Sequence, residues 1–433
     1  MKNIVIIGAG SYNFSRAIAR DIFTFPALAD SHIKLVDIPA GAQYMKAAEK
    51  FIQRVIDKGG YAGTVESTFD RREALRGADA VIITIRNDVE ISTWEKDITI
   101  PKKYGVDVVI GDTRGPSGIF RFLRSAPVLK EFASDILELC PEAVVLNYTN
   151  PMCMVTSYME HCGVKLTGLC HSVQGTAAML AKWIGADMKD VTYKCAGINH
   201  QAFYYEFKVN GKDVYPEIRK AAEKPEIYKS EAVRIEMMKG LGYFVTESSG
   251  HNSEYNAWFR KRQELIDRYI PDSYATSVRG ITKRDATREA DMEKALAQDN
   301  VSLARGQEFA AYILNSILGD GEMFEFAGNI RNNGLISNLP EDVIVEVPIV
   351  ASKRGLQPIQ VGKLPRQIAA LNTVTAQGEE LAVEGCIAGD REIIYHACVN
   401  DPLTAAVCSL EEIRHMVDEM FEANRGRLPQ FGL

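Results

Sequence analysis

Several features that mark specialised protein classes are missing from this sequence. The chain has no basic excess, because 57 acidic residues outnumber 50 lysines and arginines and give a formal net charge of −7. This balance argues against a nucleic-acid binder, which usually presents a basic face. No apolar run reaches the roughly 18 residues that predict a membrane span. Internal repeats, low-complexity segments and linkers rich in proline, glycine or serine are also missing.

The cysteines lack a pattern as well. Eight occur in 433 residues, without a repeat and without a CxxC pair, which argues against a secreted disulfide framework. Only "MKN" precedes the first apolar run, "IVIIG", so no signal-peptide pattern is present. We therefore expect a cytoplasmic protein that has neither a membrane nor a nucleic acid as its partner.

The first 195 residues alternate between short apolar runs and segments with helical spacing. β-branched runs end in glycine or polar residues at "NIVIIGAG", "HIKLVDI", "ADAVIITI", "PEAVVLNYTNP" and "VKLTGLCHS". Segments such as "AGAQYMKAAEKFIQRVIDKGG" and "MCMVTSYMEHCG" lie between them and carry apolar residues at the helical period. This alternation predicts an α/β fold, a Rossmann-like doubly wound parallel sheet with helices on both faces.

After about residue 195 the pattern becomes looser. "AFYYEFKVNGKDVYPEI" predicts an antiparallel hairpin turned at Asn210-Gly211, whereas "DATREADMEKALAQ" and "REIIYHACVNDP" predict long helices. At roughly 150 residues per domain, this length suits two or three domains. We expect an α/β domain over residues 1–195 and a C-terminal α+β domain over residues 196–433, an arrangement like that of lactate and malate dehydrogenases.

Two glycines after the first predicted strand indicate a nucleotide site. Gly8 and Gly10, followed by Ser11, stand at a strand-to-helix turn, where backbone N–H groups can approach a pyrophosphate. Asn13 replaces the third glycine of the full GxGxxG pattern. Asp37, at the end of the second strand, can accept hydrogen bonds from ribose hydroxyls and would repel a 2′-phosphate. The order predicts NAD rather than NADP, bound by residues 1–195; the alternative is that the glycines only cap a helix.

A thiol and an imidazole follow further along the chain. Cys170 comes just after a predicted strand, at the carboxyl edge where open α/β sheets bind ligands, and His200 follows thirty residues later in "AGINH". A thiolate and an imidazole together suit a borderline divalent cation with positions left open for substrate oxygens. The alternative for each residue alone is structural, because most single cysteines are buried and inert.

Two polar loops also follow predicted strands. "VVLNYTNP" ends with Asn147 and Asn150, and "GDTRGPSGIFRFLR" carries Asp112 in a glycine-rich turn before a helix with Arg121 and Arg124. Binding residues collect in loops of this kind at strand ends. The alternative is a turn with helix caps.

One short segment, "LGYFVTESSGHNSEYNAWF", is unusually rich in titratable groups. Tyr243, Glu247, His251, Glu254 and Tyr255 all lie in it. A tyrosine serves as a general base only if its pKa, near 10 in model peptides, is lowered, and a metal cation or a nicotinamide could supply the positive field. The alternative is a solvated helix start, since the threonine and serines of the segment are good N-cap residues.

Taken together these segments resemble family 4 of the glycoside hydrolases. The resemblance rests on "GAGS", "GDTRGPSGIFRFLR", "NYTNPM", "CHSVQGTA", "CAGINHQAFY", "LGYFVTESSGH" and "RNNGLISNLP", and it runs from about residue 3 to "YHACVNDPLTAAV". Within the family it is nearest to the melibiose-cleaving α-galactosidases. Ser117 departs from the family's usual "GPGG", and Gly250 departs from its usual "SSEH".

The resemblance implies an NAD- and Mn²⁺-dependent hydrolase, an exception to the two-carboxylate scheme of glycoside hydrolysis. It implies oxidation of the sugar at C3, deprotonation at C2, elimination of the leaving group, addition of water and re-reduction. It also implies a homodimer or homotetramer. The "CHSV" stretch argues against a phosphorylated substrate.

The family's functional residues map onto single positions of this chain. Cys170 and His200 match the metal ligands, and Asn150 matches the substrate-binding asparagine. The resemblance assigns His171 as the general acid, Tyr243 as the base and Asp112 as the carboxylate that assists the base.

Three other functions stay open at this point. The sugar could instead be an α-glucoside or an α-galacturonide within the same family. A malate-type NAD-dependent dehydrogenase with net oxidation of its substrate is an alternative from a different class. A non-enzymatic NAD-binding sensor is a further one.

Overall fold

A large mixed sheet forms the centre of the molecule in the computed structural model, which describes residues 1–86, 91–297, 301–306 and 308–432. Within these residues the sheet has nine strands in the order β13-β12-β11-β6-β5-β4-β1-β2-β3. Its parallel strands are β1 (Asn3–Ile7), β2 (His32–Val36), β3 (Thr64–Thr68), β4 (Ala80–Ile83), β5 (Val144–Asn147) and β6 (Leu166–Leu169). Their order, 3-2-1-4-5-6, is that of dinucleotide-binding folds, so the predicted fold class is confirmed.

The central strands are apolar on both faces because helices cover both sides. Ile4 and Ile6 of β1 face one core cluster, and Val5 and Ile7 face the other. The first cluster takes many of its helical residues from α1 and α2, and the second takes many of its own from α5 and α6. The helices of this part are α1 (Tyr12–Phe23), α2 (Ala42–Gly59), α3 (Arg71–Leu75), α4 (Ile91–Lys103), α5 (Gly115–Leu139), α6 (Met152–His161) and α7 (Ser172–Trp183). Near-continuous apolar runs are typical of strands buried on both faces.

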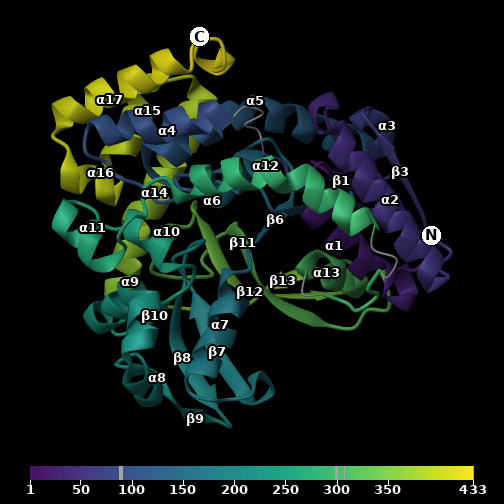
Figure 1. Cartoon of the computed structure of the whole chain (residues 1–433), viewed down its shortest axis with the longest axis horizontal. Helices are drawn as coiled ribbons and strands as arrows, with labels where there is room; N and C mark the ends of the chain where they lie inside the picture. Colours follow the sequence, from purple (N-terminus) through teal and green to yellow (C-terminus); the bar gives the residue numbers. More distant parts are fainter. Residues whose placement is uncertain (87–90, 298–300, 307, 433) are drawn as a thin grey trace.

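A second, antiparallel sheet projects from the large one together with α8 (Figure 1). It contains β7 (Val191–Ala196), β8 (Phe203–Val209), β9 (Lys212–Asp213) and β10 (Phe244–Val245). The predicted hairpin is confirmed: β8 and β9 are antiparallel, and Asn210 and Gly211 turn between them with φ of 49° and 77°. Positive φ at both residues matches the hairpin turns that favour Asn-Gly.

The C-terminal half does not form its strands only in a separate sheet. β11 (Phe324–Arg331) runs antiparallel to β6, and β12 (Ile344–Ser352) and β13 (Gly355–Pro358) extend the same large sheet. β6 would otherwise be an edge strand with unpaired backbone groups, and β11 covers that edge. The division at residue 195 therefore stays a prediction, because the large sheet takes strands from both sides of it.

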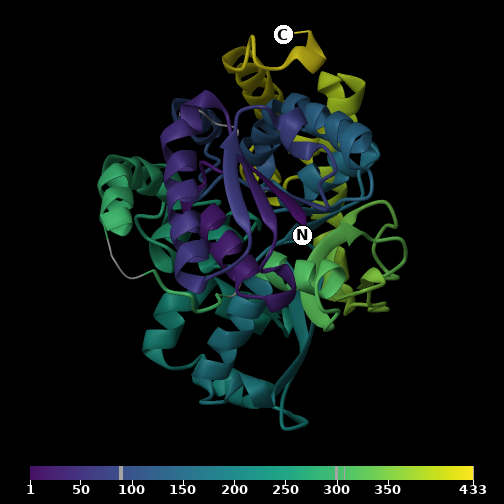
Figure 2. The same ribbon diagram turned by 90° about the vertical axis from the view of Figure 1, so that its right-hand side faces the viewer.

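Helices from the second half pack back onto the first (Figures 1 and 2). The C-terminal helices α15 and α17 lie beside α4 and α5. The bounds are α8 (Tyr215–Ala221), α9 (Pro225–Leu241), α10 (Ser249–Glu254), α11 (Gln263–Tyr269), α12 (Thr276–Ala297), α13 (Phe309–Leu318), α14 (Arg366–Ala388), α15 (Arg391–Val399), α16 (Pro402–Val407) and α17 (Leu410–Ala423). Gln298, the end of one predicted helix, lies outside the described residues. None of the helices that the structure describes has the length and apolar character needed to cross a membrane.

Buried polar side chains hold the loop between α4 and α5. The Glu254 carboxylate accepts hydrogen bonds from three successive backbone N–H groups, at residues 109, 110 and 111, over 2.5, 2.8 and 3.1 Å. Arg260 is 1% exposed; it pairs with the Asp107 carboxylate and donates to the Asp107 carbonyl over 2.8 Å. These contacts set the position of Asp112, which follows directly in the same loop.

Replacing Arg260 by Met should destabilise the fold. The variant keeps an apolar stem but leaves the Asp107 carboxylate without its buried partner, which we expect to lower the free energy of unfolding by about 3 kcal/mol. Urea unfolding followed by circular dichroism measures the change. Arg262→Met is the control, because its side chain is 59% exposed and surface substitutions usually change stability by less than about 0.5 kcal/mol. Equal unfolding midpoints for the two variants would contradict the expectation.

Candidate functional site

The glycine turn after β1 has the close backbone approach that its sequence predicts. Gly8 has φ of 89°, and a Cβ there would lie 2.8 Å from backbone atoms of Thr84 and Ile85. Only glycine fits this position, because a side chain would collide with fixed backbone at a φ that other residues rarely adopt. Asn13, which replaces the third glycine, is an exposed residue of α1.

Asp37 lies beside this turn, at the end of β2. Its carboxylate accepts hydrogen bonds from the backbone N–H of Gly10 and, over 2.7 Å, from that of Ile38. Ser11 is the N-cap residue of α1, but its side chain makes no capping hydrogen bond. The turn, the helix N-terminus and the carboxylate therefore stand together at one edge of the sheet.

Three side chains with metal-binding atoms converge at the same carboxyl edge. The ligand atoms of Cys170, His200 and Glu247 all lie within 4.8 Å of one another. Cys170 follows β6, His200 follows β7 and Glu247 follows β10, so the three come from separate parts of the chain. The sequence predicts Cys170 and His200 as ligands; Glu247 was only one of several acidic or basic groups in its segment.

Burial and charge set the protonation of these groups. Burial lowers the pKa of His200 to about 4, so its imidazole is neutral and can offer a lone pair. Burial would raise the pKa of Glu247, but His200 and His251 hold it well below its usual range. Burial also raises the pKa of Cys170 to about 12. A bound cation would displace the thiol proton, since metal ligands bind as thiolates.

His251 joins Asp112 to Glu247. Its Nδ1 lies 3.0 Å from Glu247 Oε1, and its Nε2 lies 3.6 Å from Asp112 Oδ1. Burial alone would lower the pKa of His251, but the two carboxylates raise it to about 10. Because His251 holds Glu247 Oε1, the other oxygen, Oε2, is the one that faces His200 Nε2 at 3.6 Å.

Tyr255 lies directly against His200. The Tyr255 hydroxyl is 3.0 Å from His200 Nδ1, and the two rings stack with centroids 6.2 Å apart. With the Nδ1 proton donated to this hydroxyl, His200 Nε2 carries the free lone pair. Tyr255 is 1% exposed and burial raises its pKa well above 10, so it orients the imidazole and does not titrate near neutral pH.

His171 contacts residues outside the cluster of Cys170, His200 and Glu247. Its Nε2 lies 2.9 Å from Glu308 Oε2, and its ring stacks on Tyr148 with centroids 6.0 Å apart, with Phe14 of α1 nearby at 6.2 Å. Its side chain is 45% exposed. The hydrogen bond to Glu308 raises the pKa of His171. The imidazole thus borders the glycine-turn side of the site.

Tyr243 packs among aromatic residues of the second sheet. Its ring packs edge-to-face on Tyr215, with centroids 6.0 Å apart, at the second sheet. The contacts of the described residues join Tyr243 to this aromatic cluster, whereas they join Tyr255 to His200. Its assignment as the base stays a prediction.

The two asparagines of the "NYTNP" loop differ in their partners. Asn147 is used inside the loop: its amide donates to the Thr149 carbonyl and accepts from the Thr149 N–H, each over 3.0 Å. Asn150 precedes a cis-proline, and its buried Oδ1 has no hydrogen-bond partner among the described residues. A buried polar atom without a protein partner calls for a water, an ion or a ligand, and of these two asparagines Asn150 has such an atom in its side chain and Asn147 does not.

A buried carboxyl lies behind Cys170 that the sequence reasoning missed. Glu346 on β12 is 1% exposed and accepts a hydrogen bond from Asn329 Nδ2 over 3.4 Å. Burial raises the pKa of Glu346 to about 8, and its charge is among the causes that raise the pKa of the Cys170 thiol. Asn329 lies within β11 and Glu346 within β12. Neither strand segment contains a motif, so the local sequence gave no signal for these two residues.

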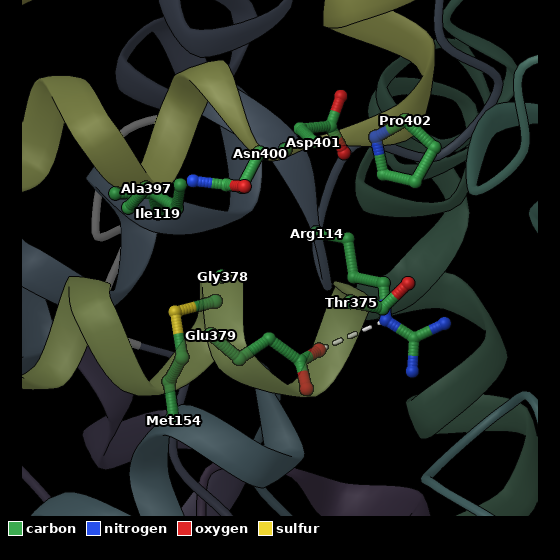
Figure 3. Close-up of a pocket in the computed structure, with 11 residues that line it drawn as sticks. Arg114, Ile119, Met154, Thr375, Gly378, Glu379, Ala397, Asn400, Asp401 and Pro402 are labelled. Atoms are coloured by element: carbon green, nitrogen blue, oxygen red, sulfur yellow. Dashed lines mark hydrogen bonds and ion pairs between the residues drawn. The ribbon is translucent and has the colours of Figure 1, made fainter. Parts of the chain in front are cut away.

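Arg114 pairs with Glu379 of α14 over 2.8 Å (Figure 3). The pair borders a small cavity of about 20 Å³ that Asn400 and Asp401 also line. The guanidinium lies 4.5 Å from the centroid of the Tyr255 ring. Arg114 therefore connects α14, through Glu379, to Tyr255 beside His200.

The helix after Asp112 carries two buried arginines, and the charge of Arg121 is among the causes that lower the pKa of Asp112. Arg124 forms a buried ion pair with Asp97, and Arg121 lies over the Trp94 ring at 4.6 Å. Ser117, one of the departures from the usual motif, donates to the Asp97 carbonyl over 2.8 Å. A Cβ at Gly250, the other departure, would meet only ordinary contacts at 3.4 and 3.6 Å, so the backbone does not require glycine there.

Comparison with known proteins covers nearly the whole chain. The model of the family 4 glycosyl hydrolases matches residues 3–186, and the model of their C-terminal domain matches residues 195–404. The chain belongs to family 4 of the glycosyl hydrolases. This confirms the family that the sequence motifs predict.

Individual members of family 4 show how far the similarity extends. An α-galactosidase of Bacillus subtilis (strain 168) is 37% identical over 437 residues and is covered completely, as is this chain. An α-galactosidase of Rhizobium meliloti (strain 1021) is 35% identical, over 99% of this chain and 89% of that protein. A 6-phospho-α-glucosidase from gut microorganisms, crystallised with NAD and Mn²⁺, aligns over 99% of both chains with a TM-score of 0.82 at 18% identity. The last comparison supports the fold.

Removing the charge of Glu247 should weaken metal binding. Glu247→Gln keeps the size of the side chain but replaces an anionic ligand by a neutral amide, so we expect the dissociation constant for Mn²⁺ to rise by at least about tenfold. Electron paramagnetic resonance of free Mn²⁺ measures it. Glu264→Gln, at a side chain that is 69% exposed, is the charge-matched control. The same affinity in both variants would remove Glu247 from the ligand set.

Proposed function

We propose that this chain is an α-galactosidase that hydrolyses melibiose-like α-galactosides with bound NAD⁺ and Mn²⁺. The observation that carries the proposal is the convergence of Cys170, His200 and Glu247 at the carboxyl edge of a dinucleotide-binding sheet. Two α-galactosidases of the family, at 37% and 35% identity over almost the full chain, support the choice of sugar.

The glycine turn fits the dinucleotide. Gly8 and Gly10 leave room for the backbone to approach a pyrophosphate at the N-terminus of α1, where the Ser11 side chain makes no competing hydrogen bond. We assign the ribose hydroxyls to Asp37, whose charge disfavours a 2′-phosphate. Residues 1–195 would then be the NAD-binding domain, and residues 196–433 the substrate and oligomerisation domain.

The donor set fits a divalent cation. A thiolate, a neutral imidazole and a carboxylate provide sulfur, nitrogen and oxygen ligands, and three protein ligands leave positions for substrate oxygens. When bound, NAD⁺ accepts and returns a hydride, and Mn²⁺ acts as a Lewis acid on the sugar oxygens. We assign Cys170 and His200 as the ligands from the family motif, and add Glu247 from its position.

The remaining residues bind the sugar and move protons. Asn150 offers an unpartnered Oδ1 to a sugar hydroxyl. His171, next to the metal cysteine in sequence and 45% exposed, would protonate the leaving group. Tyr243 would take the C2 proton with Asp112 assisting. Asp112 keeps its negative charge through His251, which holds its pKa well below the usual range although burial opposes this.

The alternative functions differ in their substrates and products. An α-glucosidase or α-galacturonidase of the same family would use the same residues on a different sugar. A malate-type dehydrogenase would oxidise its substrate and accumulate NADH, and family 4 membership argues against it. We also propose a homodimer or homotetramer in the cytoplasm, on the family resemblance.

A panel of p-nitrophenyl α-glycosides tests the function. With NAD⁺, Mn²⁺ and a reductant, we expect release of p-nitrophenol from the α-galactoside without net formation of NADH. Dialysis against EDTA should abolish the activity and added Mn²⁺ should restore it. Cys170→Ser should lose activity even with Mn²⁺, because the hydroxyl does not provide a thiolate ligand.

The panel separates the alternatives. Cleavage of the α-glucoside or α-galacturonide with no action on the α-galactoside would reject the sugar but keep the family chemistry. Stoichiometric NADH with no sugar released would identify a dehydrogenase. Activity that survives chelation unchanged would reject the metal site.

The charge of Asp37 should control the choice of dinucleotide. Asp37→Asn keeps an oxygen acceptor but removes the repulsion of a 2′-phosphate, so the dissociation constant for NADP⁺ should fall about tenfold, with a smaller change for NAD⁺. Fluorescence titration measures both. Asp57→Asn, on the exposed side of α2, is the control for net charge. An unchanged affinity for NADP⁺ would place the ribose elsewhere.

A further inference from the structure

Two of the three candidate metal ligands have a left-handed backbone. His200 has φ of 61° and Glu247 has φ of 66°. Few non-glycine residues adopt this conformation, and where they do the surrounding structure must hold them there. The contacts on either side of each residue show what holds it.

Arg114 holds the segment around His200. Its guanidinium donates to the backbone carbonyl of Asn199 and, over 3.2 Å, to the side-chain carbonyl of Gln201. These are the residues directly before and after His200. Arg114 also lies over the ring of Tyr255, whose hydroxyl contacts His200 Nδ1.

Asn252 holds the segment around Glu247 in the same way. Its Nδ2 donates to the carbonyl of Thr246 over 2.8 Å and to the carbonyl of Ser248 over 3.2 Å. These carbonyls flank Glu247 on either side. Each left-handed ligand therefore has one buried donor that holds both of its neighbours.

The two holding residues are connected. Gln201 Nε2 donates to Asn256 Oδ1 over 2.9 Å, and Asn256 Nδ2 donates to the Asn252 carbonyl over 2.7 Å. We call the four side chains the positioning chain: Arg114, Gln201, Asn256 and Asn252. All four are at most 5% exposed, so water does not compete for these hydrogen bonds.

We propose that the positioning chain holds His200 and Glu247 face to face before a divalent cation arrives. The inference rests on the metal site of the proposed function and names residues that do not contact the cation themselves. Gln201 and Asn256 are its central link, because the hydrogen bond between them joins the two halves. Side chains that orient metal ligands commonly set the metal affinity.

Near-isosteric substitutions at the central link test the proposal. Gln201→Met and Asn256→Leu each remove the joining hydrogen bond, and we expect the dissociation constant for Mn²⁺ to rise about tenfold in each. The double variant should weaken binding by less than the product of the two single effects, because both changes break the same joining hydrogen bond while each also removes one further contact. The dissociation constant for NAD⁺, measured in parallel, should not change, since the glycine turn is not part of the positioning chain.

Asn424→Leu is the matched control. Asn424 is a buried asparagine that donates to the Met420 carbonyl over 2.8 Å and accepts from Arg124 over 3.1 Å, outside the positioning chain. Its loss should lower stability and leave the Mn²⁺ affinity unchanged. If Gln201→Met does not fold, Gln201→Glu keeps an acceptor for Arg114 and replaces the donor to Asn256 by a carboxylate oxygen, which opposes the Asn256 oxygen. It should still weaken Mn²⁺ binding.

The outcomes separate the two levels of inference. Wild-type Mn²⁺ affinity in the folded Gln201 and Asn256 variants would overturn the positioning role while leaving the metal site intact. Equal weakening by Asn424→Leu would overturn it too, because general loss of stability would then explain the effect. A wild-type protein that binds no Mn²⁺ would instead overturn the metal site of the proposed function.

Discussion

The candidate metal site depends on one constraint. The neutral imidazole of His200 and the ionised carboxylate of Glu247 must be held face to face with little water around them. Burying such groups without partners costs several kcal/mol. His200 is 5% exposed and Glu247 is held well below its usual pKa by two neighbouring histidines. Tyr255 and His251 provide the partners on the sides away from the other ligand. Hydrogen bonding thus orients both side chains while leaving one atom of each available.

The topology of the sheet brings the parts of the site together. Parallel strands β1, β2, β5 and β6 end at one edge, which places the glycine turn, Asp37, Asn150 and Cys170 along it. The second sheet contributes His200 and Glu247 from the ends of β7 and β10. The glycine turn of a dinucleotide-binding sheet and the cluster of Cys170, His200 and Glu247 are therefore both built at the carboxyl ends of strands.

Local patterns were enough to predict much of this arrangement. The period of the apolar residues predicts the parallel strands, and the glycines with Asp37 predict the nucleotide turn, because these signals depend on neighbours within one strand and helix. The addition of β11 to β6 was not predicted, since antiparallel pairing between strands about 160 residues apart leaves no local mark. Glu247 and Tyr255 were recognised only as members of a polar segment.

The sequence by itself determined the fold class, the family and the kinds of chemical group at the sheet edge, because periodicity and motif residues are written in the order of the chain. Only the tertiary structure decided which of those groups meet. Asn150 differs from Asn147 in having an oxygen without a partner among the described residues. Glu247 lies with Cys170 and His200, and Tyr255 contacts His200. The physical reason is that distance, burial and charge at these atoms depend on segments brought together by packing, which no single stretch of sequence encodes.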